Sequence, residues 1–115
     1  MPSQDDLAAL RKAFYSLYNS LKETYYAATT EEAKDQIYGA KDLVNQILDM
    51  LDHADLEADN AAIASLTQAL NASIKNLSDL QKDLDAIVHN VAIASTALQA
   101  IDTALTVAGK VAAAV

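Results

Sequence analysis

Apolar residues recur every seven positions along the second half of the chain. One series begins at Ile63 and a second begins three residues later at Leu66. A heptad repeat of this length is typical of a helix that packs lengthwise against others, as in coiled coils and helical bundles. No Gly or Pro interrupts it between Asn60 and Gly109. The pattern therefore predicts one long helix over about residues 59–110.

Two shorter helices are predicted before it. The first, about residues 4–28, follows Ser3, whose short polar side chain suits a helix N-terminus. The second, about residues 30–56, follows Thr29 and Glu32, which have the spacing of a capping box. Both segments carry an apolar stripe at helical spacing. We therefore expect an all-α, antiparallel helical bundle with two shorter helices and one long C-terminal helix, in a single domain of residues 1–115.

The predicted helix lengths do not match. A helix of about 50 residues spans roughly 75 Å, whereas one of about 25 residues spans roughly 38 Å. The distal half of the long helix would expose its stripe unless a second copy covered it. The alternative is a four-helix up-down bundle with a break near Asn76–Asp79, where Ser78 and Gln81 have capping-box spacing. The unbroken heptad favours the long helix, because a hairpin turn has no reason to preserve its phase.

The composition agrees with an aliphatic helical core. Hydrophobic residues make up 52% of the chain, but there is one Phe and no Trp, so alanine and other small side chains must pack the helices closely. The absence of Cys excludes disulfides and thiolate sites. Polar residues follow Met1 where a secretory signal would need a basic and then an apolar stretch. We expect a cytoplasmic protein.

The chain is acidic, with a formal net charge of −8. This charge disfavours nucleic acid and anionic membrane surfaces as partners. Residues 29–60 contain 2 basic and 9 acidic side chains, which leaves them at −7. Within this stretch Asp35, Asp42 and Asp49 recur every seven residues on the outer face of the second predicted helix. They form either a solvated acidic face or a surface that steers a basic partner.

The distal part of the long predicted helix is apolar almost all round. Between Val91 and Val115 the only charged residues are Asp102 and Lys110. Such a segment is expected to contact more than one neighbour, so we predict a non-enzymatic protein that forms a homodimer or binds another protein there. The interface candidates, in addition to the three aspartates, are Leu84, Ile87, Val91, Ile93, Leu98, Ile101, Leu105 and Val107.

The tyrosines form a secondary interface candidate. All five lie in the first third of the chain, and Tyr18 and Tyr25 share one flank of the first predicted helix. Tyrosine is favoured at positions that are half buried and half wet, which describes both the rim of a bundle core and a protein interface. The sequence alone does not separate these two roles.

The sequence predicts no catalytic, cofactor-binding or metal-binding residues. Ser and Thr lack a nearby base, and no phosphate-binding loop or His-rich motif is present. Two other functions remain as alternatives. His89 invites comparison with histidine phosphotransfer domains, which are also helical bundles of this size, but Ala92 and Ile93 stand where that family has Lys and Gly. Residues 91–115 would be the inserting segment of a membrane-active protein, although their polar residues oppose insertion into a bilayer.

Overall fold

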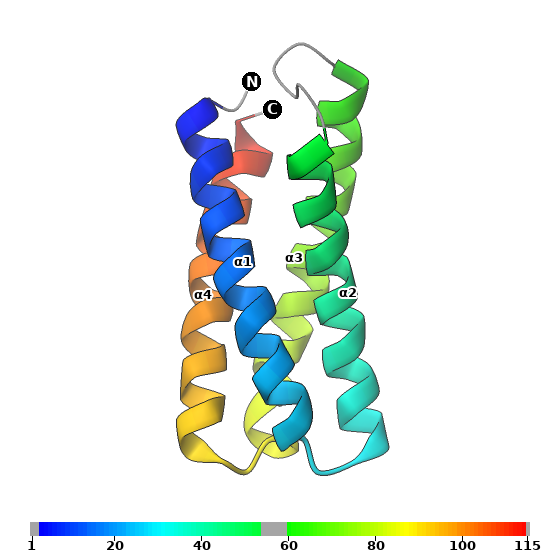
Figure 1. The fold of residues 1–115 in the computed structure, drawn as a ribbon, viewed down its shortest axis with the longest axis vertical. Coiled ribbons are helices and arrows are strands. Elements are labelled where there is room, and N and C mark those ends of the chain that lie inside the picture. The colour runs from blue at the N-terminus through cyan, green and yellow to red at the C-terminus, as the bar shows by residue number, and fades with distance from the viewer. Residues whose placement is uncertain (1–2, 54–59, 115) are drawn as a thin grey trace.

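The computed structural model describes residues 3–53 and 60–114, which form four α-helices (Figure 1). They are α1 (Gln4–Ala27), α2 (Glu31–His53), α3 (Asn60–Ile87) and α4 (Val91–Ala113). The helices run alternately up and down, and each packs against the next, with α4 returning to α1. The prediction of an all-α helical bundle is confirmed. α1 lies close to its predicted bounds, while residues 54–56 of the predicted second helix lie outside the described residues.

The prediction of one long third helix over residues 59–110 is wrong. The chain turns at residues 88–90, and the two helices on either side of the turn are antiparallel. The alternative correctly proposed a four-helix up-down bundle, but it put the break near Asn76–Asp79. Those residues lie within α3. The same chain therefore covers one of the two distal apolar series, the one that contains Ala94, Ile101 and Ala108.

Local contacts explain why the chain turns at residues 88–90. The side chain of Asn90 caps α4 by accepting a hydrogen bond from the backbone N–H of Ile93 at 3.1 Å. Val88 is buried and forms an isolated antiparallel bridge with Ala28, which lies in the turn between α1 and α2. The two turns thus meet at one end of the bundle (Figure 1).

The turn before α2 has a similar cap, one residue from the predicted position. The hydroxyl of Thr30, rather than that of Thr29, accepts a hydrogen bond from the backbone N–H of Ala33 at 3.1 Å. Short polar side chains relieve the unbonded N–H groups of a helix N-terminus. Both tight turns therefore depend on a capping side chain and use no glycine.

The buried stripe shifts position between α3 and α4. In α3 it follows the two predicted heptad series, from Ile63 and Leu66 onward. In α4 only the series that begins at Leu66 stays buried. The other buried line of α4 consists of residues that the heptad pattern places outside the core. The buried residues of α4 are Ala94, Ala97, Ile101, Ala104, Ala108 and Val111. The seven-residue spacing thus continues in the sequence across the turn. α4 is rotated about its own axis, however, so it turns a different line of residues toward the core.

Two polar residues, Thr24 and Ser73, are completely buried in this core. The hydroxyl of Thr24 donates to the backbone carbonyl of Ser20 at 2.7 Å. The hydroxyl of Ser73 has no hydrogen-bond partner among the described residues. A buried hydroxyl without a partner loses its solvation and gains little in return, so Ser73 weakens the core of α3.

The position of the turn can be tested with proline. Val91 is the first residue of α4, where proline fits because no intrahelical bond uses its N–H and because Asn90 is extended. We expect Val91→Pro to change the free energy of unfolding by less than about 1 kcal/mol. Ser78→Pro lies inside α3 and should cost about 3 kcal/mol or more. Urea unfolding followed by circular dichroism measures both, and a reversed order would contradict the turn at residues 88–90.

Removal of the unpartnered hydroxyl should stabilise the bundle. Ser73→Ala loses no hydrogen bond and removes a desolvated polar group, so we expect the free energy of unfolding to rise by about 1 kcal/mol. Ser65→Ala, at an exposed position of the same helix, is the matched control and should change it by less than about 0.5 kcal/mol. A loss of stability in Ser73→Ala would show that the hydroxyl is solvated or bonded in solution.

Candidate interaction surface

Most of the predicted distal interface is used inside the chain. Leu84 and Ile101 are completely buried. Five more candidates are half-buried against the same core, namely Ile87, Ile93, Leu98, Leu105 and Val107. Only Val91 stands out, with 81% of its surface exposed beside the turn. Leu98 and Leu105 follow Val91 at seven-residue spacing along α4, and both are partly buried.

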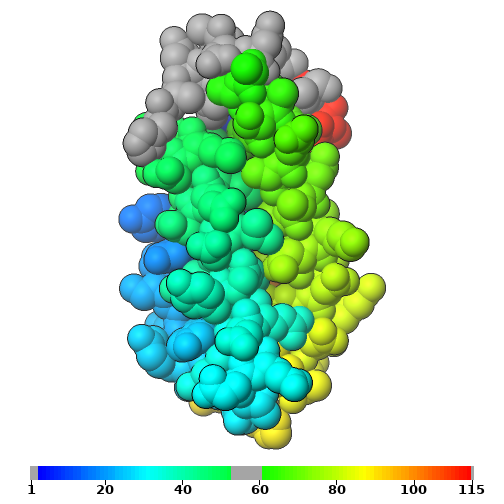
Figure 2. All heavy atoms as spheres, turned by 90° about the vertical axis from the view of Figure 1, so that its right-hand side faces the viewer, coloured from blue at the N-terminus to red at the C-terminus, as the bar shows by residue number. Residues whose placement is uncertain are grey.

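The three predicted aspartates lie on the surface of α2. Asp35, Asp42 and Asp49 are all exposed, and Asp42 accepts a hydrogen bond from Gln46 at 3.2 Å within the helix. Figure 2 shows the outer surface of α2, with α1 at its left edge in blue and α3 at its right edge in yellow-green. The acidic line runs along this outer surface.

A tyrosine face lies next to this acidic line, on the side of the bundle formed by α1 and α2. α1 supplies Tyr15, Tyr18, Tyr25 and Tyr26, and α2 supplies Tyr38. Three of the five rings project into solvent, since Tyr15, Tyr26 and Tyr38 expose 58%, 79% and 55% of their surface. Single exposed apolar residues are common on proteins, but a group of large aromatic side chains on one side is typical of a binding surface.

Lysine side chains lie among these rings. The Lys41 amine stands 5.5 Å from the ring centre of Tyr18 and 5.0 Å from that of Tyr38, so it links the two helices. The Lys34 amine stands 5.4 Å from the ring centre of Tyr25. Cation–π contacts of this kind contribute about 0.5–1 kcal/mol at exposed sites. Within the described part of the chain, neither amine lies within 4.0 Å of a carboxylate oxygen.

The rings also contact one another. Tyr25 meets Tyr26 edge to face at a centroid distance of 5.5 Å, and it meets Tyr38 in a similar arrangement at 6.4 Å. Offset and edge-to-face pairs are the favoured geometries for aromatic rings. These contacts connect Tyr26 and Tyr38, two of the three exposed rings, to the half-buried ring of Tyr25.

The tyrosine face contains two hollows, one lined by basic and the other by acidic side chains. The basic hollow, of about 190 Å³, lies toward the turns and is lined by Lys22, Tyr25, Tyr26, Tyr38 and Lys41. The acidic hollow, of about 290 Å³, lies toward the opposite end and is lined by Tyr15, Tyr18, Asn45, Leu48, Asp49 and Asp52. One face therefore carries opposite charges at its two ends.

Arg11 ties α1 to α2 at the acidic end of this face. Its guanidinium group lies 3.3 Å from a carboxylate oxygen of Asp52 and also donates to the backbone carbonyl of Leu51. Cationic side chains at a helix C-terminus interact favourably with its free carbonyl groups. Asp49, one helical turn from Asp52, is exposed beside this pair.

Part of this surface was recognisable in the sequence. The flank shared by Tyr18 and Tyr25 identified one half. The other half is the spacing of Lys34, Tyr38 and Lys41, which puts two lysines and a tyrosine on one flank of α2. That the two flanks face the same side of the bundle follows only from the packing of α1 on α2.

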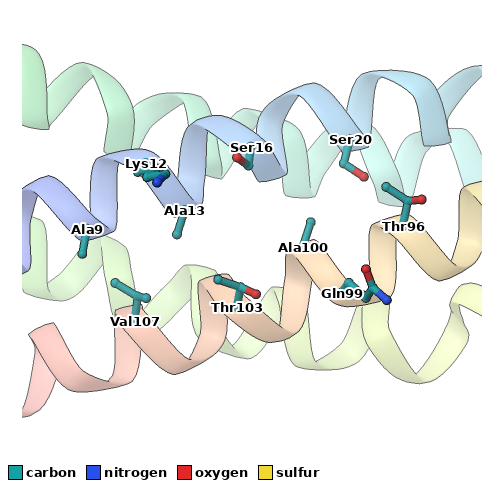
Figure 3. Close-up of a pocket in the computed structure, with 10 residues that line it drawn as sticks. All are labelled: Ala9, Lys12, Ala13, Ser16, Ser20, Thr96, Gln99, Ala100, Thr103 and Val107. Atoms are coloured by element: carbon teal, nitrogen blue, oxygen red, sulfur yellow. The ribbon is translucent and has the colours of Figure 1, made fainter.

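A second groove runs between α1 and α4 (Figure 3). It measures about 530 Å³ and is lined by Ala9, Lys12, Ala13, Ser16, Ser20, Thr96, Gln99, Ala100, Thr103 and Val107. Lys12 supplies its one charged lining residue. The groove exists because small side chains cover the contact between the two helices, and it offers a ligand little charge and few large apolar groups.

Among the described residues, no group of three or more His, Cys, Asp and Glu side chains gathers to hold a metal ion. His89 is exposed beside a hollow that is lined by Asp85, Ser95 and apolar residues and has no lysine or arginine. Among the described helices, α4 alone has the length and composition of a membrane span, but its surface also exposes Asp102 and Lys110.

Comparisons with known proteins add no relative. No protein-family model, no curated protein and no solved structure matches this chain.

Proposed function

We propose that the protein is a non-enzymatic helical bundle that works by binding a protein partner through the tyrosine face. The observation that carries this proposal is the cluster of five tyrosines with Lys34 and Lys41 on the side formed by α1 and α2. Tyrosine is enriched at protein interfaces because its ring supplies contact area and its hydroxyl can bond to a partner.

The contacts that Tyr25 and Tyr38 already make favour binding. A side chain that is already held loses less conformational freedom when a partner immobilises it, a cost of about 0.5–1.5 kcal/mol for each flexible side chain. Tyr38 is held by Lys41 and Tyr25, and Tyr25 is held by Lys34. This cost is therefore lower for Tyr25 and Tyr38 than for side chains without such contacts.

The other surfaces support binding less well. The distal seam around Leu98 and Ile101 is occupied by packing within the chain. The groove between α1 and α4 is lined mainly by Ala, Ser and Thr, which bury little apolar area against a partner. The acidic line on α2 supplies charge without aromatic side chains, which suits steering more than tight contact.

The proposal is tested by the size of the complex that the chain forms in cell extract. We expect the native protein to elute from a sizing column well above its 12.2 kDa monomer mass. The double variant Tyr26→Ser and Tyr38→Ser should elute as a monomer, because it removes the two most exposed rings near the basic hollow.

The matched control for this experiment is Val91→Ser. It removes another large exposed side chain but lies outside the tyrosine face, so the complex should persist. A native chain that elutes as a monomer, or a complex that both variants leave intact, would contradict the proposed function.

A further inference from the structure

We infer that the partner of the tyrosine face is a second copy of this chain, bound with its helices antiparallel across a two-fold axis. This inference rests on the proposed function and adds the identity of the partner. It is based on the division of charge along the face, which carries a basic hollow toward the turns and an acidic hollow toward the other end.

A two-fold axis brings these opposite charges together. In a symmetric dimer the same surface is used by both copies, so a face that binds itself must be self-complementary. An axis that lies in the interface and crosses the helices at right angles reverses the direction of α2. The basic end of each copy then covers the acidic end of the other.

The order of residues along α2 fits this arrangement. Lys41 lines the basic hollow and Asp49 the acidic hollow, and they lie four residues to either side of Asn45 in α2. A two-fold axis that crosses α2 at Asn45 brings Lys41 toward the partner's Asp49. The tyrosines then lie in the centre of the interface, with charged groups around them, as in protein interfaces generally.

Four of the eight basic residues are on the tyrosine face or at its edge, namely Arg11, Lys22, Lys34 and Lys41. They place positive groups on a molecule whose net charge is −8, and these are the groups that the acidic end of a second copy would meet.

Charge reversal tests the arrangement with the purified full chain. We expect the wild type to sediment as a dimer. Lys41→Glu and Asp49→Lys should each raise the dimer dissociation constant about tenfold or more, because each brings like charges together at two symmetric places. When the two variants are mixed in equal amounts, a heterodimer should form with close to wild-type affinity, since both of its contacts are again between opposite charges.

Two control variants make the same changes in charge on α3, outside the tyrosine face. Lys75→Glu and Asp85→Lys are exposed on α3 and should leave the wild-type dimer unchanged. Circular dichroism of all four variants checks that they fold. Analytical ultracentrifugation over a range of concentrations gives the dissociation constants, and a mass tag on one variant identifies the heterodimer.

Two results would overturn the inference. One is a purified wild type that stays monomeric at every concentration, and the other is a dimer that the two face variants affect no more than the α3 variants do. If the purified chain is monomeric while the complex in extract still depends on Tyr26 and Tyr38, the proposed function stands and the partner is a different protein. If no complex depends on these tyrosines, both proposals fail.

Discussion

The contact between α1 and α4 closes the bundle, and the remaining features of the molecule depend on it. α4 lies against α1 through small side chains such as Ala13 and Ala100, so the two helices approach closely. This contact lets the last helix bury its apolar residues inside one chain. Without it, the stripe that continues through Ile101 would need a second molecule to cover it.

The contact between α1 and α4 also depends on the two turns that meet at one end of the bundle. A short turn brings α4 back along α3, and the bridge between Val88 and Ala28 joins this turn to the one between α1 and α2. Asn90 and Thr30 begin the helices that follow. Because capping side chains satisfy the free N–H groups, both turns are tight although neither contains glycine.

Local signals in the sequence were enough to predict the helical fold and the first two helices, but not the break before α4. Ser3 accepts from Asp6 and forms the capping box of α1, and such a cap is encoded within a few residues. Asn90 is an equally local cap, yet it lies in an unbroken heptad, where a continuous helix is the simpler interpretation. The heptad misled because Leu98 and Leu105 flank the core while Ala97 and Ala104 enter it. That exchange depends on how closely α1 and α4 approach, which no local pattern contains.

Only the part of the candidate surface that lies on one helix was predictable from the sequence, because the rest depends on how the helices pack. The spacing of Tyr18 and Tyr25 put two rings on one flank of α1. The position of Lys41 between Tyr18 and Tyr38 joins residues from two helices, and only the packing of α1 on α2 brings them together.

In the proposed dimer, the distribution of charge provides the selectivity. An acidic molecule repels copies of itself, and the line of Asp35, Asp42 and Asp49 extends that repulsion along the outer surface of α2. The tyrosine face interrupts it with cations that are held by aromatic rings. Specific association requires repulsion at the wrong surfaces as well as attraction at the right one. A surface that complements itself under these conditions favours a closed pair over an open chain of copies, because both copies use up the same face.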